Sequence, residues 1–329
     1  MKKHLLIILT IVLSVFVSSC SQNCKKGSGY TIKDNTIVFD EPERIEGQKS
    51  VLQLAVDPIP VVRIGFIGLG MRGYSAVARI SHIEGVEFKA LCDLTQEHVD
   101  FVNKHVIEPK KLPKCAEYVG EDEWKKLCER DDIDLVYICS DWATHVPMAV
   151  YAMQHGKHVA IEVPAATSVE ECWQLVDVAE QTQRHCMMLE NCCYDFFELT
   201  CLNMAQQGLF GEVIHAQGAY IHNLEDYWTR YHNNWRLDFN QKHAGDVYPT
   251  HGLGPVCQVL NIHRGDKMDY LVSMSTPSIN GLKIAKEQMG VDTFANGDMT
   301  STLIKTNKGK TILIQHNVYT PRPYDRLYQ

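Results

Sequence analysis

The residues VVRIGFI (61–67) and GLGMRG (68–73) decide the fold of this chain. The first segment is a continuous apolar run, typical of a strand buried on both faces of a parallel sheet. The second follows the pattern Gly-x-Gly-x-x-Gly and precedes apolar residues at helical spacing. Gly68 allows a tight turn, Gly70 lets the backbone approach a pyrophosphate, and Gly73 lets the helix pack closely on the strand. We therefore predict a dinucleotide site at the start of that helix, where free N–H groups face the phosphates.

A second strand expected over 86–92 ends at Asp93, twenty residues after Gly73. A carboxylate at this position accepts hydrogen bonds from the adenosine ribose hydroxyls. No arginine follows Asp93 directly, so NAD is favoured over NADP, whose extra phosphate the carboxylate would repel. Met71 and Arg72, inside the glycine loop, are further candidate contacts of this cofactor.

Strand and helix patterns alternate beyond this point and predict an α/β fold with a doubly wound parallel sheet. Helices are expected over 96–106, 121–130, 145–155 and 168–183, and strands over 134–139, 158–163 and 185–190. Ligands bind at the carboxyl ends of such strands. That rule nominates five cofactor-side residues: Ser140, Trp142, His145, Glu162 and Asn191. Three of these residues have an equally good structural explanation when each is considered alone. Trp142 could serve packing, His145 could cap a helix, and Asn191 could form a turn.

The two ends of the chain suggest further parts. Two lysines, an apolar run over 5–17 and Val-Ser-Ser-Cys20 resemble a bacterial lipoprotein signal peptide over 1–20, with lipidation at Cys20. A plain signal peptide is the alternative. Residues 21–60 are polar and proline-punctuated, which predicts a tether. Residues 61–195 are expected to form the Rossmann domain, and 196–329 an α+β substrate domain with a mostly antiparallel sheet, including a helix over 196–208 and a strand over 212–220.

Charge and cysteine usage narrow the partners. The net charge is −8 with no basic block, which argues against nucleic acid. The chain has 12 cysteines, several of them inside apolar runs, and we expect mostly free, buried thiols. Paired Cys-x-x-Cys motifs and His-Glu-x-x-His are absent from the sequence, so no metal site is predicted. The membrane is expected to be a partner only through the lipid, in an exported protein facing the periplasm or the cell surface. A homo-oligomer is compatible with the sequence.

Proton-transfer candidates lie in the second half. Tyr248 and His251 are three residues apart, separated by Pro249 and Thr250. An unperturbed histidine pKa of ~6.5 suits a base, and a tyrosine near ~10 suits a donor. A core histidine near a helix start is the alternative. The region 220–236 is rich in aromatic, amide and guanidinium groups that suit a carbohydrate, although a surface loop packed on itself explains most of them.

These motifs resemble the Gfo/Idh/MocA superfamily of NAD(P)-dependent sugar oxidoreductases. The resemblance rests on Gly68–Gly73, Asp93, Ala-Thr-His145, Gly156-Lys-His-Val159 and Glu162-Val163-Pro164. The superfamily usually carries lysine where this chain has Val163. Because valine cannot transfer a proton, an ordinary sugar dehydrogenase becomes the alternative reading, with a non-catalytic sugar-binding lipoprotein as a second one.

Longer motifs are similar to one branch, the glycoside hydrolase family 109 α-N-acetylgalactosaminidases. They are Met71-Arg72, Trp142-Ala-Thr-His145, Glu162-Val-Pro-Ala-Ala166, Cys186-Met-Met-Leu-Glu-Asn191 and Gly245-Asp-Val-Tyr248-Pro-Thr-His251-Gly-Leu-Gly-Pro255. The resemblance implies a glycan substrate with terminal N-acetylgalactosamine, bound by Tyr220, Arg236, Tyr194 and Tyr324 together with residues 248–251. It also implies redox-neutral hydrolysis, in which NAD oxidises C3, the acidified C2 proton is removed, the glycosidic oxygen is eliminated, water adds and C3 is reduced again. Family members continue beyond this chain's last residue, so we expect an incomplete substrate domain, with a hairpin near 307–310 short of sheet partners.

Overall fold

The computed structural model describes residues 30–39, 41–44 and 46–329, and divides the chain into two compact units, Met1–Gly47 and Gln48–Gln329. The predicted lipidation site, Cys20, lies outside the described residues. The first unit contains a hairpin of β1 (Tyr30–Lys33) and β2 (Thr36–Phe39). The segment 21–60, predicted to be a tether, therefore contains a short hairpin. Asp34 and Asn35 both adopt positive φ, 49° and 60°, as a tight hairpin turn requires, and β-branched residues flank them.

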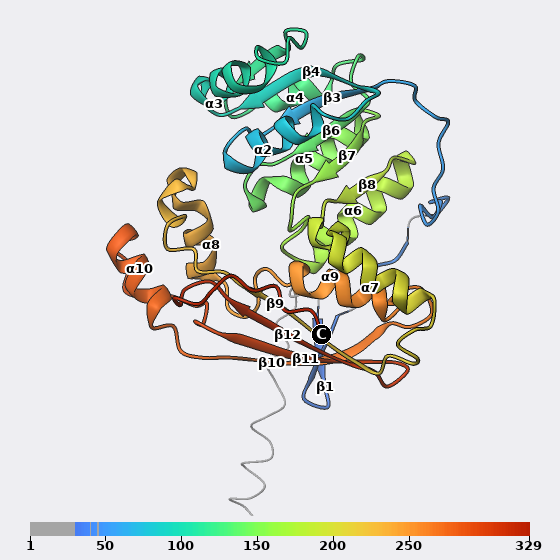
Figure 1. Cartoon of the computed structure of the whole chain (residues 1–329), viewed down its shortest axis with the longest axis vertical. Helices are drawn as coiled ribbons and strands as arrows, with labels where there is room; N and C mark the ends of the chain where they lie inside the picture. The colour runs from blue at the N-terminus through green and yellow to red at the C-terminus, as the bar shows by residue number, and fades with distance from the viewer. Residues whose placement is uncertain (1–29, 40, 45) are drawn as a thin grey trace, which may run out of the picture. The chain divides into compact units, whose positions relative to one another are not determined.

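The Rossmann sheet is confirmed, with six parallel strands in the order β5-β4-β3-β6-β7-β8 (Figure 1). Its strands are β3 (Val62–Ile67), β4 (Val86–Asp93), β5 (Ala116–Val119), β6 (Leu135–Ile138), β7 (His158–Ile161) and β8 (Cys186–Met188). The strand order reverses between β3 and β6, and such a switch point opens a crevice for ligands. Strand β5, too short to give a clear apolar period, is absent from the sequence-based prediction.

Helices cover both faces of this sheet and form two apolar clusters. They are α2 (Met71–Ile80), α3 (Gln96–Val102), α4 (Glu123–Cys128), α5 (Trp142–Gln154) and α6 (Val169–Thr182). Helix α3 continues into a π-helical turn, η2 (Asn103–Ile107). Helix α5 begins three residues earlier than predicted, because the Asp141 side chain accepts the Ala143 N–H and caps it.

A second sheet has the order β10-β11-β12-β9, with β12 parallel to β9 and the other pairs antiparallel. Its strands are β9 (His215–Ile221), β10 (Met268–Ser275), β11 (Thr300–Thr306) and β12 (Thr311–Asn317). The hairpin at 307–310 therefore has partners on both sides, and the expectation that it lacks them is wrong. Local patterns do not reveal the pairing of β12 with β9, because the paired residues, such as Thr311 and His215, are far apart in sequence.

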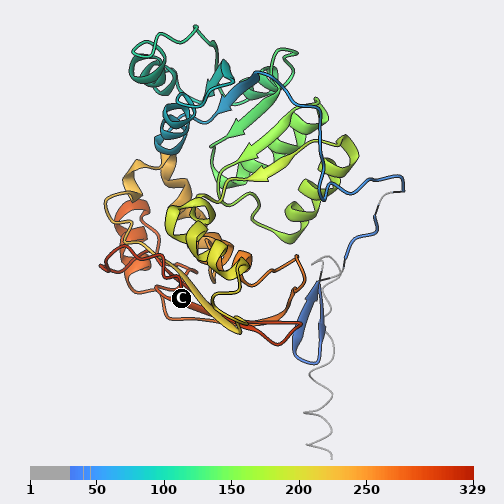
Figure 2. The same cartoon turned by 45° about the vertical axis from the view of Figure 1, so that its right-hand side comes forward.

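Four helices accompany this sheet: α7 (Phe196–Gln206), α8 (Trp235–Lys242), α9 (Thr250–Val259) and α10 (Asn280–Met289). Helix α9 packs on β9 (Figure 2). Gly218 and Gly252 make that approach possible, because a Cβ at Gly218 would lie 2.2 Å from the Gly252 carbonyl oxygen. The contact sets the depth at which α9 presents its first turn.

The last residues run along the free edge of β9. Gly218 forms an antiparallel bridge with Tyr328, and Ile221 forms one with Asp325. The terminal segment thereby brings Tyr324 and Arg326 to the end of β9. Across the residues that the structure describes, no helix is long and apolar enough to cross a membrane.

Candidate active site

The glycine loop leaves room for a dinucleotide. Gly68 has φ +84°, and a Cβ there would lie 2.7 Å from the Cys139 carbonyl group. A Cβ at Gly73 would lie 1.8 Å from the Gly68 oxygen, which explains the close contact of α2 with the loop. At Gly70, by contrast, an added Cβ meets no protein atom within 4 Å. No side chain caps the first turn of α2, so its N–H groups are available to phosphate oxygens. The loop fits NAD.

Asp93 ties β4 to the glycine loop. Its Oδ2 accepts the Leu69 N–H at 2.6 Å, and its Oδ1 accepts the Thr95 N–H at 3.0 Å and lies 2.8 Å from Nδ1 of His98. The Thr95 hydroxyl also donates to Oδ1, at 3.3 Å, so these four contacts use the carboxylate's lone-pair positions and a ribose hydroxyl would replace one of them. Asp93 therefore orients the loop at the position predicted for the cofactor ribose.

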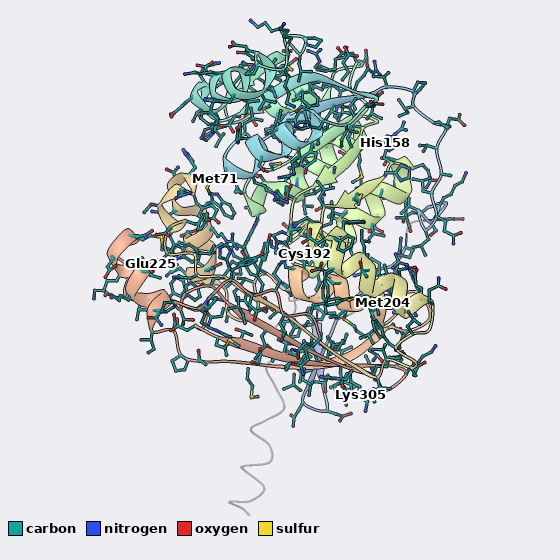
Figure 3. The ribbon with its side chains drawn as sticks, in the orientation of Figure 1. Met71, His158, Cys192, Met204, Glu225 and Lys305 are labelled. Carbon is teal, nitrogen blue, oxygen red and sulfur yellow. The ribbon has the colours of Figure 1, made fainter. Side chains whose placement is uncertain are left out.

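Arg72 joins the ends of two further strands. Its Nε lies 2.7 Å from Oε2 of Glu162 after β7, and its Nη2 donates to Oδ1 of Asn191 after β8 at 3.2 Å. Tyr137 donates to the other oxygen of Glu162 at 3.0 Å. The structure thus brings together three predicted cofactor-side residues. Met71 is 42% exposed at the start of α2 (Figure 3).

Other residues at the strand ends have mainly positioning contacts. The ring nitrogens of buried His145 lie 2.7 Å from the Pro164 carbonyl oxygen and 3.1 Å from that of Ser140, and burial lowers the pKa of its imidazole. His145 thereby links the loops after β6 and β7 and has no ring nitrogen left for a ligand. The Ser140 hydroxyl accepts from Thr144 at 2.9 Å, and Val163 is buried.

His251 and Glu190 form the central pair of the site. Helix α9 carries His251 in its first turn, and Glu190 follows β8. The His251 Nδ1 lies 2.7 Å from Oε1 and 3.0 Å from Oε2 of Glu190. Burial opposes ionisation of Glu190, but the bonds from His251 and the Cys192 N–H outweigh it and lower the carboxyl pKa. An ionised carboxylate accepts the Nδ1 proton, which leaves Nε2 as the acceptor nitrogen.

Aromatic rings surround this pair. The ring centroids of Tyr248 and Tyr220 lie 4.8 and 5.2 Å from that of His251, both edge to face. Trp142, predicted to contact the cofactor, stacks on Tyr248 at 5.6 Å. Burial raises the pKa of Tyr248 well above its ordinary value, although the Arg236 guanidinium opposes this shift.

Arg236 is a buried cation held by rings. Its guanidinium carbon lies 5.0 Å from the Tyr248 ring and 5.1 Å from the Trp142 ring, and Nη1 donates to Tyr231 at 2.7 Å. Within the described ranges no carboxylate forms an ion pair with it, and its Nε lacks a hydrogen-bond partner. A buried donor without a partner is costly, so this group suits an acceptor oxygen of a ligand.

The other residues predicted to contact the substrate differ in how they are placed. Tyr324 packs edge-on against His222 at 4.8 Å, and Nδ1 of His222 lies 2.9 Å from the Tyr220 hydroxyl, so Tyr324 lies at the site. Tyr194 is 55% exposed at the end of the short 3₁₀ helix η3 (Asn191–Tyr194). Pro249 is the N-cap residue of α9 and Thr250 its first residue, and both are half-buried.

Sequence reasoning did not select Glu190 as a site residue, and it included His222 only within the carbohydrate-suited region 220–236. Glu190 stands beside the nominated Asn191 at a strand end, so the strand-end rule could have included it. Glu190, Cys192 and His251 also bring ligand atoms within 4.8 Å of one another. The Arg326 guanidinium lies 2.8 Å from the Cys192 sulfur, however, and its positive charge opposes a cation there. Cys192 lies beside α9 (Figure 3).

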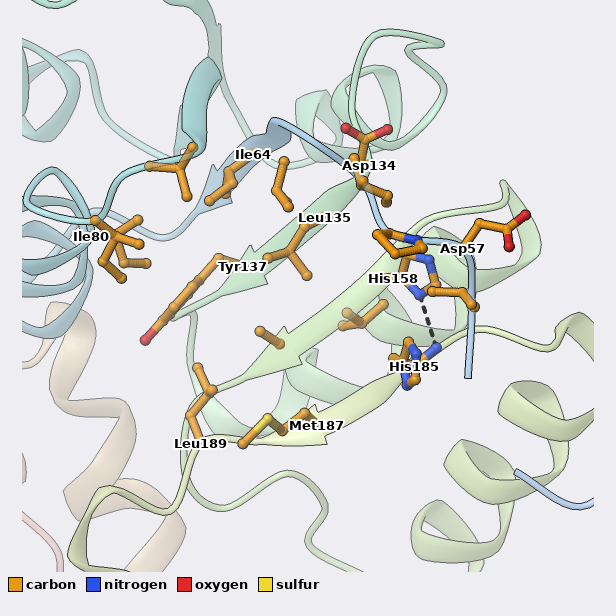
Figure 4. Close-up of a pocket in the computed structure, with 18 residues that line it drawn as sticks. Asp57, Ile64, Ile80, Asp134, Leu135, Tyr137, His158, His185, Met187 and Leu189 are labelled. Atoms are coloured by element: carbon orange, nitrogen blue, oxygen red, sulfur yellow. Dashed lines mark hydrogen bonds between the residues drawn. The ribbon is translucent and has the colours of Figure 1, made fainter. Parts of the chain in front are cut away.

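A separate apolar pocket of about 520 Å³ lies on one face of the Rossmann sheet (Figure 4). It is lined by residues that begin strands, including Val62, Leu135 and His158, and the His185 N–H donates to His158 at 3.0 Å. The predicted cofactor residues lie at the opposite, carboxyl ends of these strands.

The ten described cysteines are all free, as predicted for this part of the chain.

Comparisons with known proteins agree with this geometry. The family model "Oxidoreductase family, NAD-binding Rossmann fold" matches residues 62–190, and "Glycosyl hydrolase 109, C-terminal domain" matches residues 194–329. Among solved structures, myo-inositol dehydrogenase from Lactobacillus casei, in complex with NAD(H) and myo-inositol, has a TM-score of 0.60 at 18% identity. That match covers 82% of this chain and 70% of the other, and it shows a shared fold.

Two relatives from Bacteroides fragilis are much more similar in sequence. An α-N-acetylgalactosaminidase is 55% identical over 293 residues, covering 85% of this chain and 69% of the relative. Glycosyl hydrolase family 109 protein 1 is 59% identical over 320 residues, covering 96% of this chain and 68% of the relative. The chain carries an NAD-binding Rossmann domain and belongs to glycosyl hydrolase family 109.

Proposed function

We propose that this chain is an NAD-dependent glycosidase that removes terminal α-linked N-acetylgalactosamine by the redox-neutral route. The observation that carries the proposal is the Glu190–His251 pair, which faces Tyr248 beside the carboxyl ends of an NAD-type sheet. The name of the 55%-identical relative supports this substrate class. Val163 supports hydrolysis over ordinary dehydrogenation, because it offers no proton-transfer group where the superfamily has lysine.

Bound NAD supplies a reversible hydride acceptor at the sugar. Gly70 and the first turn of α2 would hold its pyrophosphate, and Asp93 its ribose. Arg72, with Glu162 and Asn191, would border its reactive end, because these side chains join the ends of β7 and β8 beside the loop.

The proton-transfer work falls to the second half of the chain. His251 takes a proton from the sugar through Nε2, since Glu190 holds the other ring nitrogen. Tyr248 stays protonated because burial raises its pKa, and so it donates to the departing glycosidic oxygen. Arg236 donates to a carbonyl or hydroxyl oxygen of the sugar, which satisfies its unpaired Nε.

We also propose that the chain is exported and anchored by a lipid on Cys20, facing the periplasm or the cell surface. The support is the apolar run ending in Val-Ser-Ser-Cys20. Cys20→Ser should abolish incorporation of a labelled fatty acid and release the protein from the membrane fraction. Unchanged labelling of that variant would refute the anchor.

The function is tested with a chromogenic aryl α-N-acetylgalactosaminide on protein stripped of NAD. Aryl release should require added NAD, while NADH should not accumulate in proportion to product. Steady NADH formation on free sugars without aryl release would instead establish a dehydrogenase. Absence of both signals would favour a sugar-binding protein.

A further inference from the structure

We propose that Tyr220, positioned by His222, forms a second proton-transfer path in this site, separate from the Glu190–His251 pair. The inference rests on the proposed function and deepens it. It assigns the proton of the oxidised sugar hydroxyl to Tyr220 and the carbon-bound proton to His251.

The geometry places one tyrosine between two histidines. Tyr220 is buried near the end of β9, and its hydroxyl lies 2.9 Å from Nδ1 of His222. Its ring centroid lies 5.7 Å from that of His222 and 5.2 Å from that of His251, with both histidines nearly perpendicular to it. The tyrosine therefore contacts His222 through its hydroxyl and the His251–Glu190 pair through its ring.

The ring of His222 is fixed by its other neighbours. Tyr324, from the terminal segment, packs edge-on against it at 4.8 Å, and Tyr227 does so at 5.5 Å. Its surroundings keep it neutral, because burial, the Arg236 guanidinium and His251 all lower the pKa of His222. The titratable and charged groups facing it are Tyr220, Tyr227, Tyr324, Arg236 and His251. A neutral Nδ1 accepts a hydrogen bond from the tyrosine hydroxyl, and because its pKa is lowered it would hold the tyrosine proton only transiently.

Arg236 makes proton transfer through Tyr220 feasible. Burial raises the pKa of Tyr220, but the positive charge of the Arg236 guanidinium opposes the rise by favouring the phenolate. A positive group beside a developing phenolate stabilises it strongly in a site with little water. Arg236 therefore stabilises negative charge on Tyr220 in addition to donating a hydrogen bond to the sugar.

The reaction needs two proton acceptors at once. A histidine that has taken the hydroxyl proton is an imidazolium and cannot then take the proton from carbon. In the proposed path the hydroxyl proton moves to Oη of Tyr220, and the tyrosine's own proton moves to Nδ1 of His222. The O–H electron pair becomes the second carbonyl bond, while the hydride leaves carbon with its pair for NAD. The reverse transfers restore the hydroxyl at the end of the cycle, and His251 remains free for the carbon acid.

The test uses the full chain with NAD and the aryl glycoside, comparing Tyr220→Phe and His222→Gln with His215→Gln. His215 lies on the same strand as Tyr220, is exposed and contacts Thr311, so it is a matched control. We expect kcat to fall by about 10²-fold or more in Tyr220→Phe and at least about tenfold in His222→Gln. KM should change by less than about threefold in both, and the control should retain wild-type rates.

Deuterated substrates give the decisive readout. With deuterium at C3, the isotope effect on kcat should rise in both variants, because oxidation becomes slower than the other steps. With deuterium at C2, the effect should shrink or vanish. A loss of activity seen in KM alone, a wild-type kcat in both variants, or an increased C2 effect would each overturn the proposal. If the His222→Gln protein loses its folded circular dichroism spectrum, Tyr220→Phe, which removes only one oxygen, decides alone. Failure of the wild-type chain to release the aryl group would instead refute the proposed function itself, and this inference with it.

Discussion

The Nδ1 atom of His251 lies 2.7 Å from Oε1 of Glu190, although 61 residues separate them in sequence. Glu190 follows a strand of the Rossmann sheet, and His251 lies in the first turn of a helix packed on the second sheet. Their contact therefore joins the cofactor-binding half to the substrate half. It also fixes the ring orientation that a histidine base needs.

Glu190→Gln should lower kcat by ~10²–10⁴-fold, because an amide no longer selects the Nδ1–H tautomer or stabilises the imidazolium. The folded-state pKa of Glu190 is lowered, so activity and the carboxylate's contribution to stability should be present above its unfolded pKa and lost as pH falls through the folded value. Rate measurements across acid pH check this. Glu121→Gln, on the surface, is the control. Full activity in the Glu190→Gln variant would exclude the pair from catalysis.

Gly70→Ala should weaken NAD binding, whereas Gly73→Ala should lower the stability of the fold. The Gly70 substitution adds a methyl group to open space, so the protein should keep its Tm while NAD affinity falls at least about tenfold. The Gly73 substitution places Cβ 1.8 Å from a backbone oxygen and should lower stability by about 1–3 kcal/mol. NAD titration and thermal unfolding separate the two effects. Unchanged NAD binding in Gly70→Ala would contradict the predicted phosphate site.

Arg236→Lys should raise KM for the glycoside and lower kcat, because an ammonium group cannot reproduce the planar donors that lie between the Tyr248 and Trp142 rings. We expect a loss of about 1–3 kcal/mol in transition-state stabilisation from steady-state kinetics. Arg230→Lys, exposed on Tyr227, is the matched control. Wild-type kcat and KM in Arg236→Lys would show that only the positive charge of Arg236 matters.

Ionisation of Asp246 should lower the stability of the fold as pH rises from 3.8 to about 6. Burial raises its carboxyl pKa from 3.8 to about 6, although the bond from the Tyr248 N–H opposes this, and Oδ2 has no partner. The folded state therefore binds more protons than the unfolded state between these values, so stability falls as pH rises across the window. Asp246→Asn should remove this dependence and raise Tm at neutral pH, whereas exposed Asp269→Asn should not. A Tm of Asp246→Asn that tracks the wild type at every pH would refute this.

Local patterns predicted the Rossmann half well. The run 61–73 and Asp93 anticipated β3, the glycine loop, α2 and the end of β4, because period, turn chemistry and helix start are properties of neighbouring residues. The strand-end rule likewise nominated Glu162 and Asn191, which Arg72 joins in the structure. The rule identifies strand ends and not side-chain directions, so it does not predict that the Trp142 ring stacks on Tyr248.

The second half depended on contacts between distant segments. His251 and Tyr248 were found from their residue types and motif, but their partners were not. Glu190 reaches His251 only because paired glycines let α9 lie against β9, and His222 meets Tyr324 only because the terminal segment returns along β9. Local sequence was enough to predict the cofactor type, the positions where helices start and the candidate base. Tertiary packing decided which carboxylate orients that base and which tyrosine lies beside it, because such pairings depend on how non-local strands and helices meet and leave no period in the chain.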